Sequence, residues 1–225
     1  MSKKIENQEE IVVAEAVSKT EKFFEENGKK VVIALVVLLL LVAGGYAYKY
    51  LVMDKNETAA AELIVAAQEN FAGETPNYDL ALNGDESGAG FLAVADEYGS
   101  TKAGNIANHY AGICYLHLGD LENAAKYLAK YKAVKGLAAE VVNAQNLGLQ
   151  GDVAVEQGDY AKAAKFFAKA VKASENNYTA PTDLYKQGLA LAAAGEVEAA
   201  KACYKAITEK YPTSMEARDA EKLLY

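Results

Sequence analysis

Histidine and cysteine are scarce in this chain, and three of the four such residues lie close together in the sequence. His109 and His117 are eight residues apart, which places them on roughly the same face of a helix, while Cys114 between them points away. Imidazole and thiolate groups bind zinc, but a zinc site takes at least three protein ligands. We therefore expect no metal site and no cofactor, and interpret the two histidines as polar groups on a binding surface.

The sequence also lacks the patterns that carry catalysis. It has no nucleophile motif, phosphate-binding loop or paired carboxylates, and nothing places a serine or cysteine beside a histidine. Asp79, Asn83, Asp85 and Glu86 have side chains that calcium accepts, but their spacing does not match an EF-hand loop. We expect no catalytic residues, and an enzyme or a sensor is the least favoured class of function.

The most apolar element is the segment 31–48, which carries no charge and no proline. A helix over residues 31–52 would be about 33 Å long, enough to cross a hydrocarbon core of about 30 Å. The 30 residues before it are too many for an ordinary signal peptide. We expect an uncleaved transmembrane helix at 31–52, with a cleaved signal peptide and a buried core helix as the alternatives.

Lysines predict the orientation of this helix. Four of them precede the span closely, at positions 19, 22, 29 and 30, and two follow it, at positions 49 and 55. Because positive charge favours the cytoplasmic side, residues 1–30 are expected to be a cytoplasmic leader. Part of the leader has the apolar spacing of an amphipathic helix, at Val13, Ala16, Val17, Thr20 and Phe24.

The segment after the span is acidic. Residues 54–225 contain 16 Lys and Arg against 24 Asp and Glu, a net charge of −8. Such a charge repels nucleic acid, which we exclude as a partner. Cys114 and Cys203 stand 89 residues apart in alanine-rich helical patterns, which is typical of small buried residues.

A repeat of 37–39 residues organises the C-terminal half. Turn glycines recur at 119, 158 and 195, and each is followed by an acidic residue and then by a second helical pattern. A helical glycine recurs seven residues earlier, at 112, 151 and 188, and is expected to pack against alanine 124, 163 or 200. The pattern predicts three pairs of antiparallel helices.

This pattern resembles the tetratricopeptide repeat over residues 104–213. The resemblance implies an all-α helical solenoid with three clear repeats and a degenerate one. We expect the solenoid and its C-terminal capping helix at 104–225. Before it, residues 53–103 would form a helical linker and the degenerate repeat, interrupted by a loop at 73–90.

In this family the first helix of each pair lines a groove that binds peptides or proteins, so the resemblance implies a binding surface. Tyr185 is the expected anchor, and the two histidines would change binding between pH 5 and 7. The expected groove residues are Ile106, His109, Ile113, Leu116 and His117; Gln145, Asp152, Val155 and Glu156; and Tyr185, Leu189 and Ala192.

The layout also resembles the ancillary subunit of the bacterial Sec translocon, through the stretch Phe-Phe-Glu-Glu-Asn-Gly-Lys at 23–29, one span and a repeat domain. This resemblance implies an inner-membrane adaptor with a cytoplasmic N-terminus and a periplasmic repeat domain. Its implied partners are the Sec translocon and periplasmic chaperones. The alternative is a scaffold of a cell-envelope or division complex with one stoichiometric partner.

Overall fold

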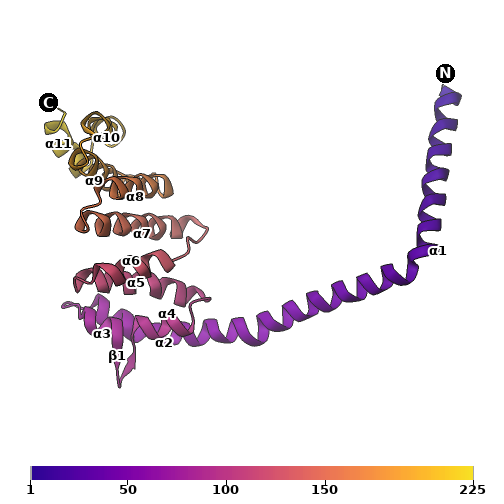
Figure 1. Cartoon of the computed structure of the whole chain (residues 1–225), viewed down its shortest axis with the longest axis horizontal. Coiled ribbons are helices and arrows are strands. Elements are labelled where there is room, and N and C mark those ends of the chain that lie inside the picture. Colours follow the sequence, from indigo (N-terminus) through magenta and orange to yellow (C-terminus); the bar gives the residue numbers. More distant parts are fainter. Residues whose placement is uncertain (1, 225) are drawn as a thin grey trace. The chain divides into compact units, whose positions relative to one another are not determined.

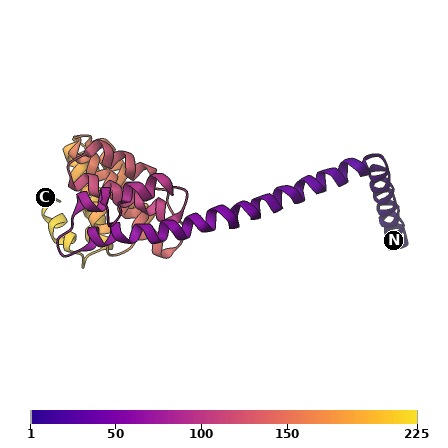
Figure 2. The ribbon, with the colours of Figure 1, turned by 90° about the horizontal axis from the view of Figure 1, so that it is seen from below.

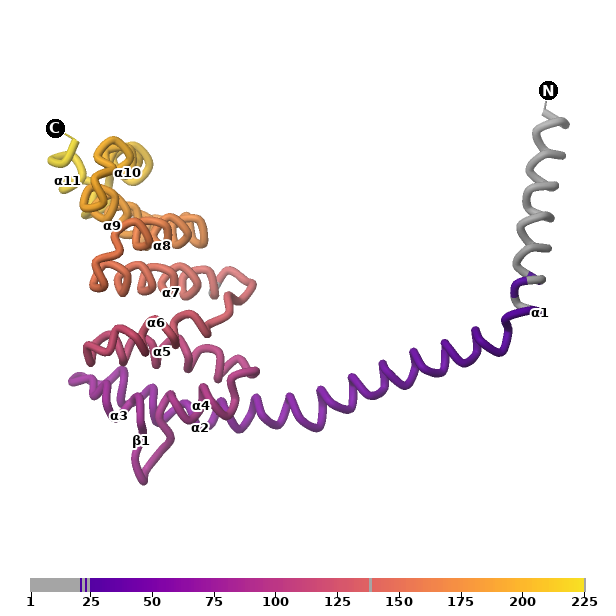
Figure 3. Tube along the Cα trace, viewed as in Figure 1, coloured from indigo at the N-terminus to yellow at the C-terminus, as the bar shows by residue number. Residues whose placement is uncertain are grey.

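The structure is a computed structural model that describes the backbone of residues 2–224 and the side chains of residues 21, 23, 25–137 and 139–224 (Figure 3). It divides into two compact units, Met1–Lys55 and Asn56–Tyr225. The all-α class predicted from the sequence is confirmed, because helices make up 79% of the chain (Figure 1).

The first unit is helical throughout its described part. Helix α1 covers Ser2–Tyr48, and a short π-helical segment, η1, follows at Lys49–Met53. Among the described residues one helical stretch, Glu25–Ala72, is long and apolar enough to cross a membrane, and its most apolar window is unburied. The expected span at 31–52 lies inside it. The side chains that would make the leader amphipathic fall outside the described residues.

The second unit begins with a small helical layer. Helix α2 covers Asp54–Ala72, α3 covers Tyr78–Asn83 and α4 covers Phe91–Glu97. Between α3 and α4, strand β1 (Gly84–Asp85) pairs antiparallel with β2 (Gly88–Ala89).

The expectation of a plain loop at 73–90 is therefore wrong. Asn77 begins α3, since its side-chain oxygen accepts the Leu80 backbone N–H at 3.0 Å. Leu82 then lies in the core with Ile64 and Phe91, so burial of a few apolar side chains orders this segment.

Three helix pairs and a final helix follow, and successive helices pack side by side (Figure 1 and Figure 2). The pairs are α5 (Lys102–His117) with α6 (Leu121–Lys130), α7 (Leu137–Glu156) with α8 (Tyr160–Ala173), and α9 (Ala180–Ala193) with α10 (Val197–Lys210). Helix α11 covers Met215–Lys222 at the position expected for the capping helix.

The turns within the pairs have the predicted chemistry. Gly119, Gly158 and Gly195 have φ values of 80°, 76° and 86°, in the left-handed region that favours glycine. Asp120 and Asp159 then cap the next helices, each accepting a backbone N–H at 3.0 Å. Local backbone chemistry thus ends one helix and begins the next.

We expect Gly158→Ala to lower the free energy of unfolding by about 1–2 kcal/mol, because a left-handed backbone is costly for alanine. No neighbouring atom lies within 4 Å of the added Cβ, so the cost comes from the backbone alone. Urea unfolding followed by circular dichroism measures it. Gly158→Asn is the matched control, because asparagine tolerates this conformation better. Equal losses in both variants would contradict the backbone explanation.

The helical glycines allow close packing, but against other residues than expected. A Cβ on Gly112 would lie 2.6 Å from Leu128, and one on Gly151 would lie 2.6 Å from Phe167. On Gly188 it would lie 2.3 Å from Tyr204. Alanine 124, 163 and 200 are buried but are not the nearest neighbours. The large residue of each second helix is what fills the space over each glycine.

Candidate protein-binding groove

Three cavities lie along the first helices of the last two repeats. A cavity of about 380 Å³ opens between α7 and the start of α9, and one of about 280 Å³ opens among α7, α8 and α9. A third, of about 570 Å³, lies between α9 and α11. Lys186 lines all three, so the cavities adjoin one another, and we call the surface that they form across α7, α9 and α11 the groove.

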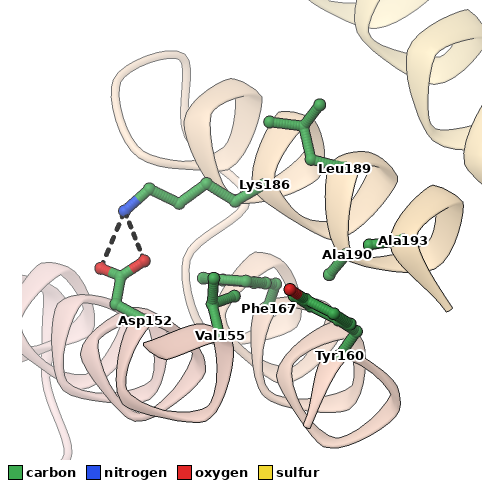
Figure 4. A pocket seen from close by; sticks show the side chains of 8 residues that line it. All are labelled: Asp152, Val155, Tyr160, Phe167, Lys186, Leu189, Ala190 and Ala193. Carbon is green, nitrogen blue, oxygen red and sulfur yellow. Dashed lines mark hydrogen bonds and ion pairs between the residues drawn. The ribbon is translucent and has the colours of Figure 1, made fainter. Parts of the chain in front are cut away.

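The 280 Å³ cavity is mainly apolar (Figure 4). Val155 of α7, Phe167 of α8 and Ala190 of α9 line it, together with Tyr160 and Ala193. Leu189 also lines it and is 46% exposed, so it stays open to solvent. The cavity can accept an apolar side chain, because burial of such a side chain here removes apolar surface on both sides from water.

An ion pair separates this apolar cavity from the 380 Å³ cavity. Lys186 Nζ lies 2.9 Å from Asp152 Oδ1 and 2.8 Å from Oδ2 (Figure 4). Both side chains are about one-third exposed, at 39% and 30%, so solvent screens the attraction. The pair therefore contributes little stability, but it fixes the Lys186 side chain across the middle of the groove.

Asp183 is the least exposed charged residue of the groove. Asp183 is 8% exposed, and its Oδ1 lies 2.9 Å from the place where a Cβ on Gly148 would stand. Burial raises the pKa of the Asp183 carboxyl to about 7; nearby Lys186 opposes this rise and Asp152 adds to it. Within the described part of the chain, its carboxylate has neither a hydrogen-bond partner nor an ion-pair partner.

Helix α11 forms the far wall of the groove. Thr182 Oγ1 donates to a carboxylate oxygen of Glu216 at 2.6 Å and so links α9 to α11. Tyr185, Leu189 and Arg218 line the 570 Å³ cavity between the two helices. The capping helix therefore extends the groove as well as covering the end of the core.

The structure brings together the expected groove residues of the second and third repeats. Gln145, Asp152 and Val155 line the cavities from α7, and Tyr185 and Leu189 line them from α9. Glu156 and Ala192 are exposed but line none of the three cavities.

The expected residues of the first repeat lie elsewhere. His109 and Ile113 are buried, and Ile106 and Leu116 are half-buried and pack against core clusters. His117 is exposed, but its ring stacks on Tyr78 of α3 with centroids 4.0 Å apart. Among the described residues, neighbouring helices therefore cover most of the five α5 positions that were expected to line the groove.

His109 also fails the expected titration between pH 5 and 7. Burial lowers its pKa to about 4, and a hydrogen bond with Gln145 opposes this shift. The Asn146 amide nitrogen lies 3.1 Å from His109 Nδ1, an arrangement that suits the neutral ring as an acceptor. His109 is a core residue that stays uncharged near neutral pH.

Sequence reasoning missed Lys186, Asp183 and the groove wall on α11. A signal was available, because Asp183 and Lys186 are the only charged residues of α9 and stand three apart, on one helix face. The wall on α11 gave no such signal, since its charged residues are typical of any exposed helix.

The described residues contain no group of three or more His, Cys, Asp or Glu that could hold a metal ion. Cys114 and Cys203 are both buried free thiols. Burial raises the pKa of the Cys114 thiol to about 12, which makes it a poor nucleophile. Both cysteines thus act as the small core residues that their surroundings predict.

A comparison with protein families matches residues 21–222 to a model described as a tetratricopeptide repeat-like domain. The match begins before the candidate membrane helix and ends in α11. A comparison with curated proteins found no match.

Proposed function

We propose a protein-interaction function for this chain, since it belongs to the tetratricopeptide repeat-like domain family, whose members typically bind proteins and are typically non-catalytic. The groove across α7, α9 and α11 binds a segment of a partner protein. The observation that carries this proposal is that three cavities adjoin one another along α7, α9 and α11, with Lys186 in the lining of each.

The groove combines the features that a peptide segment needs. The apolar cavity around Phe167 and Leu189 buries an anchoring side chain of the partner, and exposed polar groups at its edge select the orientation. Tyr185 adds a large contact area at low conformational cost. Binding energy is thus concentrated at a few residues.

The helical stretch 25–72 anchors this interaction at a membrane. Tethering raises the local concentration of the groove for partners that lie at the same membrane. We place the chain in the bacterial inner membrane, with its N-terminus in the cytoplasm and the repeat domain in the periplasm. Its resemblance to the ancillary Sec subunit supports the Sec translocon and periplasmic chaperones as partners. A scaffold with one stoichiometric partner is the alternative.

Photocrosslinking in intact cells tests the proposal. A photoreactive residue in place of Tyr185 should give adducts, whereas one in place of exposed Asp79 should not. When Leu189→Asp is combined with the photoreactive residue at position 185, most adducts should disappear. The introduced charge would make burial of an apolar partner side chain in the cavity costly. Leu118→Asp is the control, because Leu118 has a matching exposure of 47% and lies in a turn outside the groove.

The identity of the adducts separates the two functions. Many different secreted chains among them would support an adaptor, and one partner in fixed proportion would support a scaffold. Strong adducts from position 79 with none from position 185 would move the binding surface to α3 and contradict the groove.

A further inference from the structure

We propose that the 380 Å³ cavity between α7 and α9 binds a lysine or arginine side chain of the partner segment through the carboxylate of Asp183. This inference rests on the proposed function, because it names the chemistry that the groove selects.

The first support is that Asp183 is mostly buried, while its carboxylate oxygens reach the cavity and have no partner within the described residues. Its residue is more than nine-tenths buried, it lines the cavity, and within the described residues its carboxylate neither accepts a hydrogen bond nor forms an ion pair. A carboxylate with limited access to water is costly to ionise unless a partner compensates for the lost hydration. A cationic side chain entering from the groove would supply the missing partner.

The second support is that the chain makes room for this carboxylate. Asp183 Oδ1 faces Gly148 of α7, where the Cβ of any other residue would stand 2.9 Å away. Asp183 also lies in the first turn of α9, where the helix dipole favours a negative charge. The cavity volume of about 380 Å³ falls within the range of about 300–1,000 Å³ that ligand sites have.

The third support is the balance of charge. Three charged residues line this cavity, namely Asp152, Asp183 and Lys186. Lys186 Nζ contacts both carboxylate oxygens of Asp152, so a single cation in this cavity faces two acidic side chains and Asp183 lacks a direct cationic contact. A side chain with one positive charge complements it. Tyr178, which is exposed at the rim, offers the entering cation an aromatic face.

A purely structural role for Asp183 has a different consequence. Because burial raises the pKa of Asp183, its ionisation costs the free protein stability as the pH rises through about 7. Asparagine has no charge to bury at any pH. If Asp183 serves binding, its replacement by asparagine should raise the stability of the free protein at pH 8. If Asp183 serves the structure, the same replacement should not raise it.

Peptide selection on the full chain in nanodiscs provides the test. Random twelve-residue peptides displayed on phage are selected against the wild type, and the affinity of each selected peptide is measured by fluorescence anisotropy. We expect a Lys or Arg at a fixed distance from an apolar residue. Replacing it with norleucine or citrulline should weaken binding about 10- to 100-fold, as for loss of a charge-assisted hydrogen bond.

The affinity of Asp183→Asn for the peptide should change less than about twofold when the peptide's Lys or Arg is replaced. The reason is that this variant already lacks the carboxylate that binds the cation. Asp183→Asn should also melt at a higher temperature than wild type at pH 8. Glu198→Gln is the matched control, since it removes one exposed negative charge on α10, outside the groove. It should retain the full peptide discrimination.

The contrary outcomes are distinguishable. In one outcome, Leu189→Asp abolishes peptide binding, but the norleucine replacement weakens the affinity equally for wild type and for Asp183→Asn. This outcome would overturn the inference and leave the proposed function standing. If no selected peptide loses affinity on Leu189→Asp, both the inference and the proposed function are overturned. A lower melting temperature of Asp183→Asn at pH 8 would assign Asp183 to structure and also overturn the inference.

Discussion

Gly151→Val should lower the free energy of unfolding by about 3 kcal/mol, at the upper end of what overpacked cores lose. A Cβ at this position would stand 2.6 Å from the ring of Phe167, a residue that is only 1% exposed, so the ring or the paired helix must shift to admit a side chain. The two further methyl groups of valine deepen the clash and lower the helix propensity. Urea unfolding of the full chain in detergent micelles, followed by circular dichroism, measures the loss.

A double-variant cycle identifies the cause of this loss. Phe167→Ala alone should cost about 3–5 kcal/mol, because it leaves a cavity. Adding Gly151→Val to it should cost about 1 kcal/mol or less, since the valine then occupies the vacated space. Additive losses would show that the ring of Phe167 is not what excludes a side chain at position 151.

Lowering the pH from 7 to 5 should destabilise the repeat domain by about 2 kcal/mol through His109 alone. The pKa of His109 is about 4 in the folded chain, against an ordinary value of 6.5. The unfolded chain therefore binds a proton that the folded chain excludes. The stability contributed by neutral His109 is fully present above pH 6.5 and is lost as the pH falls toward 4.

His109→Gln is the variant that tests this effect, because glutamine keeps a polar side chain and does not titrate. Its stability loss between pH 7 and 5 should be smaller than that of wild type by about 2 kcal/mol. Asp183 acts in the opposite direction in both proteins, since its raised pKa stabilises the fold as the pH falls below 7. Identical curves for His109→Gln and wild type would contradict the assignment.

The helix pairs could be predicted because their signals are local. Gly158 ends α7 through its own backbone conformation, and Asp159 begins α8 by accepting an N–H three residues ahead. Neither effect depends on a distant part of the chain, so the glycine–acidic residue pattern was sufficient to place the turns. The apolar run at 31–48 is local in the same sense, since length and composition alone decide whether a helix can cross a membrane.

The exposure of the first-helix face differs from one repeat to the next. The tetratricopeptide repeat pattern assigns the same face of the first helix to binding in every repeat. That face is accessible on α7 and α9 and mostly covered on α5. Ile106 packs against a core cluster that includes Ile64 and Val94 from the N-terminal helices. No spacing within α5 reveals that these helices cover it.

The sequence by itself thus determined the paired helices of the repeats, the turns within the pairs and the apolar span. Only the tertiary structure decided that Phe167 lies over Gly151, that His109 is buried beside Asn146, and that Asp183 faces Gly148 without a partner. The physical reason is that a helix boundary depends on a few neighbouring residues, whereas burial and pKa depend on which distant surfaces meet.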